Sequence, residues 1–401
     1  MDTNDTSSIY ECDLMNFHSS YAQIHGHLSL LVCIFGSIAN ILNILVLTRR
    51  EMRTPTNLIL TGLAVADLLV MIEYIPYAIH LYLYHRSRRD TFTYGWAVFV
   101  LFHSHFGQVC HTISIWLTVS LAIWRYIAVG HPQKSREWCS YKRTTLAILA
   151  AYVFSPILCI PLYVTTVVRE HREVLDSNGM SVNLTGIESS NLGERGEASS
   201  IYRRVSVSTI SLINTSLYFV RLSETARTHG LLNELNFWIY SVVIKLLPCF
   251  VLTILILKLL GVLLEAKKRR RQLNMSKASF NGTKGKKTEK ERQTDRTTMM
   301  LLAVLLLFLV TELPQGVLGL LSVILGQGFF NTCYVMLGDV IDILTLINSA
   351  INFILYCVMG RQFRLTFEEL FCKRLKSTNW GFQTQNFTEN NGNTVTQMSQ
   401  V

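Results

Sequence analysis

The stretch Ile113–Pro132, ISIWLTVSLAIWRYIAVGHP, is a long apolar run that ends in Trp124-Arg125-Tyr126, with a proline shortly after. An arginine at such a boundary suits the point where a membrane helix meets the cytosol, because a fixed charge is costly in the hydrocarbon interior. Taken alone, Arg125 has a second interpretation, in which it only anchors the helix at the membrane interface. The segments on either side of this stretch decide its meaning.

The composition of the chain is that of a membrane protein. Its 401 residues have a mean hydropathy of +0.30, half of them are apolar, and only 16% are charged. A soluble domain normally carries about a quarter charged residues. Long, nearly uncharged runs account for the difference.

The first of these runs, Leu28–Leu47, is 20 residues long and carries no charge. That length crosses about 30 Å of hydrocarbon as a helix. Six further runs of similar character follow: Leu58–Tyr84, Ala97–Val129, Thr144–Val168, Phe237–Leu264, Thr297–Leu325 and Thr332–Met359. The sequence therefore predicts an all-α membrane protein with a seven-helix transmembrane bundle at 28–359, whose two ends lie on opposite sides of the membrane.

The distribution of Lys and Arg predicts the orientation of the bundle. The net charge of +10 is uneven, because the first 48 residues contain no Lys or Arg, whereas 265–296 contains the unbroken run Lys267–Arg271. Basic residues also follow the first, third and seventh runs, although Arg86, Arg88 and Arg89 go against the trend. We expect a plasma-membrane protein with an extracellular N-terminus at 1–27.

This topology predicts the environment of the loops and the tail. The long loop 169–236 is extracellular, and its stretch Arg203–Val220 alternates in the manner of a surface hairpin. The stretch 265–296 and the disordered tail 373–401 are cytoplasmic, and 360–372 forms a short amphipathic eighth helix. The sequons at Asn4, Asn183 and Asn214 are external and open to glycosylation, whereas those at Asn274, Asn281 and Asn386 are internal and stay bare.

Several function classes find no support in the sequence. The nine cysteines show no paired Cys-x-x-Cys spacing, so we expect no metal and no cofactor. No phosphate-binding Gly-rich loop, His-Glu-x-x-His motif or nucleophile elbow is present, so we expect no enzyme. A basic block such as Lys267–Arg271 also occurs in nucleic-acid arms, but its place between two membrane-length runs favours a cytosolic loop and no nucleic acid.

A cluster of polar residues is predicted at mid-membrane, where an Asp costs roughly 2.5–3.5 kcal/mol. Asp67 lies in the second run, and Asn348 and Asn352 are one helical turn apart in the seventh, so they share a face. The full set is Asn40, Asp67, Ser114, Asn348, Ser349 and Asn352. Such groups could hold a small hydrated cation, for which an allosteric Na⁺ is the candidate, or they could form an ordinary polar packing cluster.

With these motifs in place, the chain resembles the rhodopsin-like (class A) G-protein-coupled receptors over all seven runs. The matching features are Leu63–Asp67, Trp124-Arg125-Tyr126 in place of Asp-Arg-Tyr, Pro248, Pro314, Asn352–Tyr356 in place of Asn-Pro-x-x-Tyr, Phe363 and Cys372. The resemblance implies coupling to a heterotrimeric G protein, with arrestin and receptor kinases as further partners. It also implies an activation switch made of Arg125, Tyr126, Lys245, Phe308, Glu312, Pro314 and Tyr356.

The departures from the family pattern are also informative. Trp124 replaces the acid that usually pairs with the arginine, and Phe353 replaces the proline of the seventh helix. Glu312 stands where the family has its toggle tryptophan, and Ile256 replaces the fifth-helix tyrosine. No cysteine lies at the outer start of the third run or in 169–236, so the usual disulfide of the family cannot form.

These departures resemble a narrower group, the invertebrate myosuppressin (FMRFamide-related peptide) receptors, with the sex-peptide receptor group as a near relative. The shared features are Gln108–Pro132, the motif Thr311–Gln315 and Leu346–Cys357. The resemblance implies a short amidated peptide ending in Arg-Phe-amide as ligand and a G protein of the inhibitory type. A different peptide of the sex-peptide or myoinhibitory-peptide group is the alternative.

Cys12 and Cys333 are the cysteines that this topology places outside. In the context of the resemblance we predict a disulfide between them, which the oxidising secretory route permits. Two free thiols remain the alternative.

Charged residues within the outer membrane half predict the ligand site. Asp339 and Asp342 are three residues apart and share a face, and Glu73 lies in the outer half of the second run. An arginine of a peptide would find its counter-charge there. The acids could instead pair with Arg86, Arg88 or Arg89. The predicted ligand-binding set is Glu73, His103, His111, Trp238, Asp339 and Asp342.

Lys245 and Glu312 are a second predicted pair, since a lone buried charge is expensive. The pair is either a switch that separates when agonist enters or a static clamp. Cys372 follows the amphipathic helix beside two basic residues and is a candidate palmitoylation site in contact with membrane lipids.

Other membrane-protein classes fit less well. An opsin needs a Lys in the seventh run, and Thr332–Met359 contains none. A transporter would show matching broken helices in its two halves, which are not seen.

Overall fold

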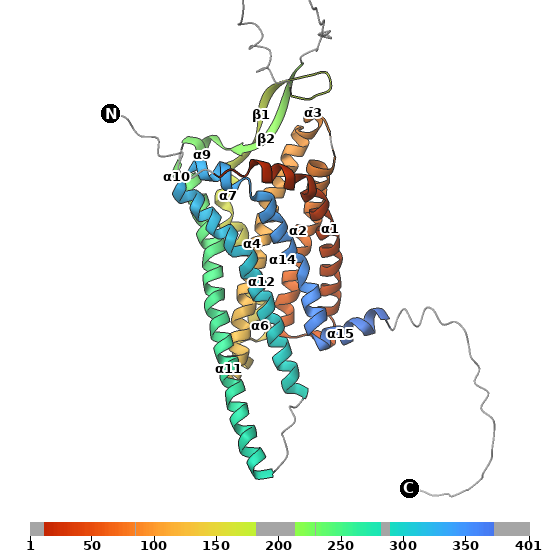
Figure 1. The fold of residues 1–401 in the computed structure, drawn as a ribbon, viewed down its shortest axis with the longest axis vertical. Coiled ribbons are helices and arrows are strands. Elements are labelled where there is room, and N and C mark those ends of the chain that lie inside the picture. The colour runs from red at the N-terminus through yellow and green to blue at the C-terminus, as the bar shows by residue number, and fades with distance from the viewer. Residues whose placement is uncertain (1–11, 85, 182–212, 229, 282–288, 373–401) are drawn as a thin grey trace, which may run out of the picture.

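The computed structural model describes residues 12–84, 86–181, 213–228, 230–281 and 289–372. Long helices stand side by side in one bundle, with a β-hairpin above one end (Figure 1). The predicted tail at 373–401 lies outside the described residues.

The first two helices are longer than their apolar runs. Helix α1 spans Met15–Leu47 and so begins well before Leu28, because its polar first turns stand clear of the apolar run and can contact water. A short 3₁₀ turn, η2 (Arg50–Met52), leads to α2 (Pro55–Ala78). The Thr54 hydroxyl accepts the backbone N–H of Asn57 at 3.1 Å and caps α2. The outer end of α2 continues as the π-helix η3 (Ile79–Leu83).

The third and fourth helices meet through a short inner helix. After α3 (Arg88–Thr91), α4 runs from Tyr94 to Gly130, followed by α5 (Pro132–Trp138) and α6 (Tyr141–Leu158). The fourth helix breaks at Cys159 and resumes as α7 (Ile160–Thr165). Pro161 explains the break, since it lacks the N–H that would continue the helix.

The hairpin above the bundle differs from the predicted one. Strand β1 (Thr166–Leu175) pairs antiparallel with β2 (Ile213–Leu222), with Thr166 opposite Leu222. Residues 203–212 of the predicted hairpin lie outside the described residues, and the described partner of β2 is β1, which begins inside the predicted fourth run. The alternating charges of β1, REHRE, hid its strand period, because both faces of a surface ribbon can be polar.

The fifth and sixth helices extend far beyond the apolar runs. A turn of helix, α9 (Glu224–Thr228), precedes α10 (Gly230–Trp238), the π-helix η4 (Ile239–Leu246) and α11 (Leu247–Asn281). Helix α12 spans Glu289–Leu325. The stretch 265–296, predicted as a loop, is thus helical in its described parts, which suits its many Lys, Arg and Glu residues.

The seventh helix begins irregularly. A left-handed Gly326 (φ +83°) ends α12, and α13 (Gln327–Phe329) and the π-helix η5 (Phe330–Tyr334) lead to α14 (Gly338–Met359). The predicted eighth helix is present as α15 (Arg361–Phe367) and η6 (Glu368–Cys372).

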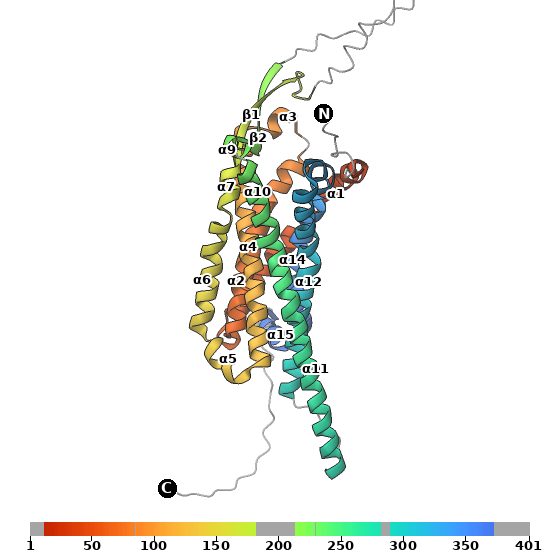
Figure 2. The same ribbon diagram turned by 90° about the vertical axis from the view of Figure 1, so that its left-hand side faces the viewer.

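Helix α4 is the centre of the bundle. It contacts α2 and α6 on one side and α11 and α12 on the other, while α14 packs against α1 and α12 and closes the ring. Figure 2 shows α6 at the outer edge. Among six membrane-length helices, the fourth is the least buried: 11% of its most apolar residues are buried, against 56% for the second, so most of its surface is turned outward.

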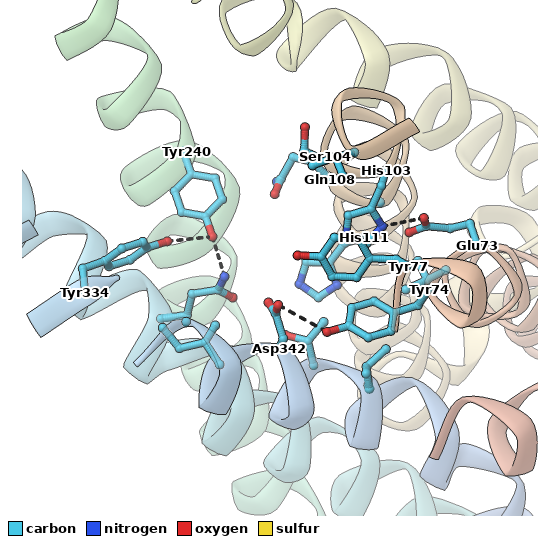
Figure 3. Close-up of a pocket in the computed structure, with 18 residues that line it drawn as sticks. Glu73, Tyr74, Tyr77, His103, Ser104, Gln108, His111, Tyr240, Tyr334 and Asp342 are labelled. Carbon is cyan, nitrogen blue, oxygen red and sulfur yellow. Dashed lines mark hydrogen bonds and ion pairs between the residues drawn. The ribbon is translucent and has the colours of Figure 1, made fainter. Parts of the chain in front are cut away.

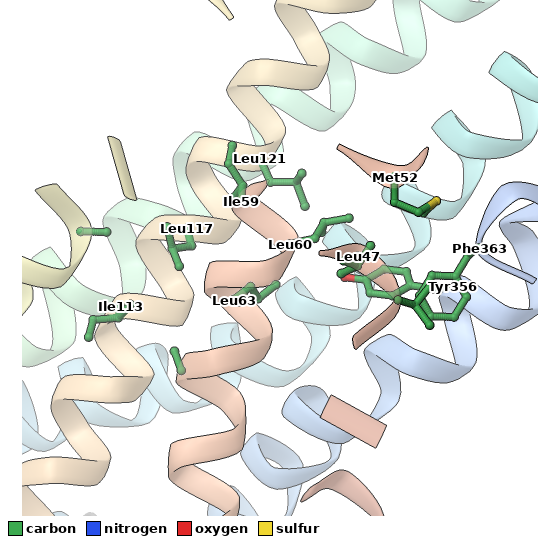
Figure 4. Close-up of a cluster of buried hydrophobic side chains, with 13 residues drawn as sticks. Leu47, Met52, Ile59, Leu60, Leu63, Ile113, Leu117, Leu121, Tyr356 and Phe363 are labelled. Carbon is green, nitrogen blue, oxygen red and sulfur yellow. The ribbon is translucent and has the colours of Figure 1, made fainter. Parts of the chain in front are cut away.

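Apolar side chains hold the inner half of the bundle together. Leu60, Leu63 and Leu117 pack between α2 and α4, and Tyr356 with Phe363 joins α14 to α15 (Figure 4). Lipid tails are as apolar as these side chains, so close van der Waals packing stabilises this contact rather than escape from water.

Candidate ligand-binding site

A cavity of about 350 Å³ lies in the outer half of the bundle, bounded by α2, α4, η4, α12 and α14. Its size lies within the range of ligand pockets. Many polar groups line it: Glu73, Tyr74, Tyr77, His103, Ser104, Gln108, His111, Tyr240, Gln315, Tyr334 and Asp342. Figure 3 shows Tyr240 and Tyr334 on the opposite side of this cavity from Glu73 and His103.

The wall formed by α2 and α4 carries an acid, a histidine and a tyrosine. His103 Nδ1 lies 2.6 Å from Glu73 Oε2, and the imidazole stacks on the Tyr77 ring at 3.9 Å between centroids. Glu73 Oε1 is buried and accepts no hydrogen bond from the described residues. Gly107 lies against it, and a Cβ at Gly107 would come within 2.9 Å of this oxygen.

The wall formed by α14 carries Asp342, which is only partly buried. The Tyr74 hydroxyl donates to Asp342 Oδ2 at 3.5 Å, which is long for an O–H···O hydrogen bond. His25 Nε2 lies 3.0 Å from the same Tyr74 hydroxyl. Asp342 is therefore a cavity acid whose oxygens remain largely open to a ligand.

The third wall is built by tyrosines and one amide. Gln315 Nε2 donates to the Tyr240 hydroxyl, which also lies 3.4 Å from the Tyr334 hydroxyl. These residues come from α12, η4 and η5, so the three outer helix ends are linked by one polar chain.

A buried ion pair, which we call the floor, lies just inward of the cavity and reaches its lining through His111. Lys245 Nζ lies 2.7 Å from Glu312 Oε2, and His111 Nε2 lies 3.0 Å from the same oxygen. The side chains of Lys245 and Glu312 are fully buried. The predicted pair between the fifth and sixth helices is present, and His111 joins it from α4.

The structure separates the predicted ligand-binding residues into two groups. Glu73, His103, His111 and Asp342 line the cavity, whereas Trp238 and Asp339 do not. Trp238 is 47% exposed on the outside of the bundle. Asp339 accepts the Tyr82 hydroxyl at 2.7 Å, and so points away from the cavity although it is one turn from Asp342. Three residues on a helix rotate by about 300°, which is about 60° short of a full turn. Asp339 and Asp342 can therefore lie on one face of α14 without lining the same cavity.

The alternative pairing of these acids with nearby arginines is not what the structure shows. Arg88 Nε donates to Glu173 of the hairpin at 3.0 Å, and Arg89 contacts Asp90. Arg86 lies over the Tyr84 ring.

Eight polar residues of the cavity were not predicted as ligand-binding residues: Tyr74, Tyr77, Ser104, Gln108, Tyr240, Gln315, Tyr334 and Thr345. One signal was present for two of them, since Gln108 and Gln315 are uncharged polar residues within membrane-length runs. The tyrosines gave no such signal, because tyrosine is also common at membrane interfaces.

The mid-membrane polar cluster forms around Asp67. Ser114 donates to Asp67 Oδ1 at 2.9 Å and Asn352 donates to Oδ2 at 3.2 Å. Asn40 instead bonds the Ser349 carbonyl at 3.0 Å, and Asn348 lines the small space beside Asp67. That space is about 10 Å³, close to the volume that one water molecule needs. The allosteric Na⁺ beside Asp67 stays a prediction.

At the inner end of α4, Trp124 occupies the position of the acid in the Asp-Arg-Tyr motif. Trp124 Nε1 donates to Thr144 Oγ1 at 2.9 Å and ties α4 to α6. Arg125 is partly buried, and Tyr126 faces Lys258 of α11, whose Nζ lies 6.0 Å from the ring centre. Phe308 is buried between α4, α11 and α12 beside the small space at Asp67, and Pro314 lies within α12.

The predicted disulfide between Cys12 and Cys333 is present. It ties the chain before α1 to η5, and the Cys12 N–H also donates to Thr332 Oγ1 at 3.2 Å. Asn214 is exposed on β2, whereas Asn4 and Asn183 lie outside the described residues. Cys372 ends η6, and its side chain also lies outside what the structure describes. In the described ranges, no group of three or more His, Cys, Asp or Glu side chains is arranged to hold a metal.

Comparison with known proteins identifies the bundle. Residues 27–181 and 207–374 match the family described as serpentine type 7TM GPCR chemoreceptor Srw. The chain belongs to this family of seven-transmembrane G-protein-coupled receptors. The receptor is therefore a multi-pass membrane signalling protein and not an enzyme.

Individual relatives cover most of the receptor. It is 30% identical to the G-protein coupled receptor dmsr-1 of Caenorhabditis elegans over 93% of its own length and 74% of the relative's. The sex peptide receptor of Drosophila melanogaster is 28% identical over 88% of the present chain and 73% of the fly protein. The FMRFamide receptor of the same fly is 26% identical over 87% of the receptor and 54% of its own chain.

Proposed function

We propose that the receptor binds a short amidated neuropeptide of the myosuppressin or FMRFamide type and passes the signal to a heterotrimeric G protein. The observation that carries this proposal is Asp342, a carboxylate on the cavity wall whose hydrogen bonding within the described part of the chain is a single long contact. A peptide arginine would supply the missing partner in a charge-assisted, two-pronged contact. The names of the fly relatives, FMRFamide receptor and sex peptide receptor, support a peptide ligand.

The size of the cavity limits how much of a peptide enters. At about 350 Å³ it is near the lower end of ligand pockets, enough for the last two residues of a peptide but not for a whole neuropeptide. The aromatic wall of Tyr240 and Tyr334 would contact an apolar side chain beside the arginine. The remaining residues would lie at the mouth, below β1 and β2.

We further propose that the signal leaves at the inner end, through Arg125, Tyr126 and the basic extension of α11, to a G protein of the inhibitory type. The Lys245–Glu312 pair lies between the cavity and that end, where agonist could separate it. The switch would also use Phe308, Pro314 and Tyr356. The two packings of the bundle would be biased by peptide and G protein reciprocally, so added G protein should tighten agonist binding.

A panel of amidated peptides tests the proposal. Cells expressing the receptor should lower their cyclic AMP in response to Phe-Met-Arg-Phe-amide or a myosuppressin. A response confined to peptides of the sex-peptide or myoinhibitory group would replace the ligand assignment but keep the receptor class. No response to any amidated peptide would overturn the proposal.

The same proposal places the N-terminus outside the cell, at the plasma membrane. Occupied glycosylation at Asn214, with bare sequons at Asn274 and Asn281, is the expected outcome of glycopeptide mapping. Accessibility of an epitope inserted at 282–288 on intact cells would contradict it. Arrestin, receptor kinases and lipids attached at Cys372 are the further partners that we propose for the inner face.

A further inference from the structure

Within the described residues, one oxygen of the Glu73 carboxylate has a hydrogen-bond partner and the other has none. His103 holds Oε2 at 2.6 Å, and Oε1 accepts no hydrogen bond from the described residues although the side chain is only 8% exposed. Both Glu73 and Gly107, which faces Oε1, line the cavity. A buried carboxylate oxygen without a donor is costly, so this position favours a ligand that brings an N–H.

The two cavity acids suit different ligand groups. Among the described residues Asp342 has one long hydrogen bond, to Oδ2, and so suits the two parallel N–H donors of a guanidinium. Glu73 offers a single oxygen, which suits one N–H of a neutral primary amide. His103 contacts Glu73, its ring lies 5.4 Å from the Tyr74 ring, and the Tyr74 hydroxyl reaches Asp342, so these two side chains connect the two acids. An arginine next to an amidated terminus has its two donor groups at such neighbouring positions.

We propose that Glu73 recognises the terminal amide of the ligand and rejects the free acid. This inference rests on the proposed peptide ligand and names a residue that selects its chemical form. A terminal carboxylate would bring a second negative charge against Glu73 in a desolvated cavity, where like charges repel strongly. A terminal carboxamide carries no charge and donates the hydrogen bond that Oε1 lacks.

The decisive test compares two peptides that differ only at the terminus. Phe-Met-Arg-Phe-amide and its free acid are competed against a labelled amidated peptide on membranes from cells with wild-type receptor or Glu73→Gln. Wild type should prefer the amide by about tenfold to a hundredfold. Glu73→Gln keeps the size and removes the charge, so the free acid should gain and the preference should fall about tenfold.

Asp339→Asn is the matched control for this test. It makes the same change of carboxylate to amide, but Asp339 does not line the cavity. The preference for the amidated peptide should stay at the wild-type value in this variant.

Gly107→Ala tests the same oxygen without altering any charge. Its Cβ would lie 2.9 Å from Glu73 Oε1, so the carboxylate must move or be covered. Gly95→Ala is the control, because a Cβ there meets nothing within 4 Å and lies in the same helix. Alanine favours a helix more than glycine does, so lost affinity cannot be ascribed to a weaker α4.

The outcomes separate this inference from the proposed function. A wild-type receptor that binds neither peptide overturns the proposed function and the role of Glu73 with it. A receptor that binds both peptides with the same preference in wild type and Glu73→Gln overturns the role of Glu73 alone. Equal affinities in Gly107→Ala and Gly95→Ala would also contradict it.

Discussion

Glu312 of the floor and Asp342 on the cavity wall are carboxylates in opposite surroundings. On the floor, Glu312 receives Lys245 at 2.7 Å and His111 at 3.0 Å and is fully buried. On the wall, Asp342 has one hydrogen bond at 3.5 Å and remains partly exposed to the cavity. A carboxylate oxygen that already has two close partners has less to offer a ligand than one with a single long hydrogen bond. The floor pair therefore stabilises the packing of the fifth and sixth helices, whereas Asp342 remains open to a ligand.

The strongest way to break this comparison is to remove one member of the floor pair. Lys245→Met leaves Glu312 charged and buried, which should cost about 3–5 kcal/mol. We expect a lower thermal midpoint in detergent and reduced surface expression. Lys258→Met is the matched control, since Lys258 is exposed on the continuation of the same helix.

The charge exchange Lys245→Glu with Glu312→Lys should recover part of the stability lost by either single change. It should also restore signalling if the pair works as a switch. A Lys245→Met receptor as stable as Lys258→Met would contradict the role of the floor.

The wall is tested by Asp342→Asn. The variant should weaken Phe-Met-Arg-Phe-amide by up to a hundredfold, about 2.7 kcal/mol, because the arginine loses its charged partner. The citrulline analogue, which carries no charge, should lose far less. Competition binding measures both peptides, and equal losses would show that Asp342 does not pair with the arginine.

The mouth of the cavity should show a smaller effect. Cys12→Ser removes the link to Cys333, which should cost about 2 kcal/mol. This is the lower part of the usual range because α1 already packs against α14, so the effective loop is short. Melting of the purified receptor without reductant measures the loss. The same melting point in wild type and variant would mean that the disulfide constrains nothing.

The smallest effect is expected in the β-hairpin, because its carboxylates, unlike those of the cavity, are exposed to water. Hydrogen bonds from Ser216 and Arg172 lower the pKa of Glu170 below its ordinary 4.5, and Arg169 lowers the pKa of Glu224. A lowered pKa means that the stabilisation is present above pH 4.5 and is lost as the pH falls through the folded value. Hydrogen exchange of β1 and β2 should therefore be unchanged between pH 7 and pH 5, after correction for the intrinsic rate. Faster exchange already at pH 5 would contradict these contacts.

Sequence analysis reached the fold because its signals are long and local. Seven apolar runs predicted the helices and their order, and the family resemblance led to the disulfide between Cys12 and Cys333. The helix ends escaped because polar residues outside the membrane carry no apolar signal, as at Met15 and in 265–296. Strand β1 escaped because its charges occupy both faces.

The site was only half predictable. Intramembrane charge identifies Glu73, Lys245, Glu312 and Asp342, since each such residue needs a reason to be buried. Their partners depend on rotation about the helix axis, which separates Asp339 from Asp342 and sends Trp238 outward. Charge alone gives no information on that rotation.

The π-helical turns around the cavity have a consequence for how such receptors diversify. Tyr240 lies in η4 and Tyr334 in η5, just outside regular helix. A π-turn accommodates an additional residue, and each added residue turns the chain beyond it by about 100°. Deletion of one residue of η4 after Tyr240 would rotate Tyr240 about the helix axis, while Pro248 and the rest of α11 kept their positions. A lineage could thus acquire a new ligand preference by a single-codon deletion, leaving the signalling end untouched.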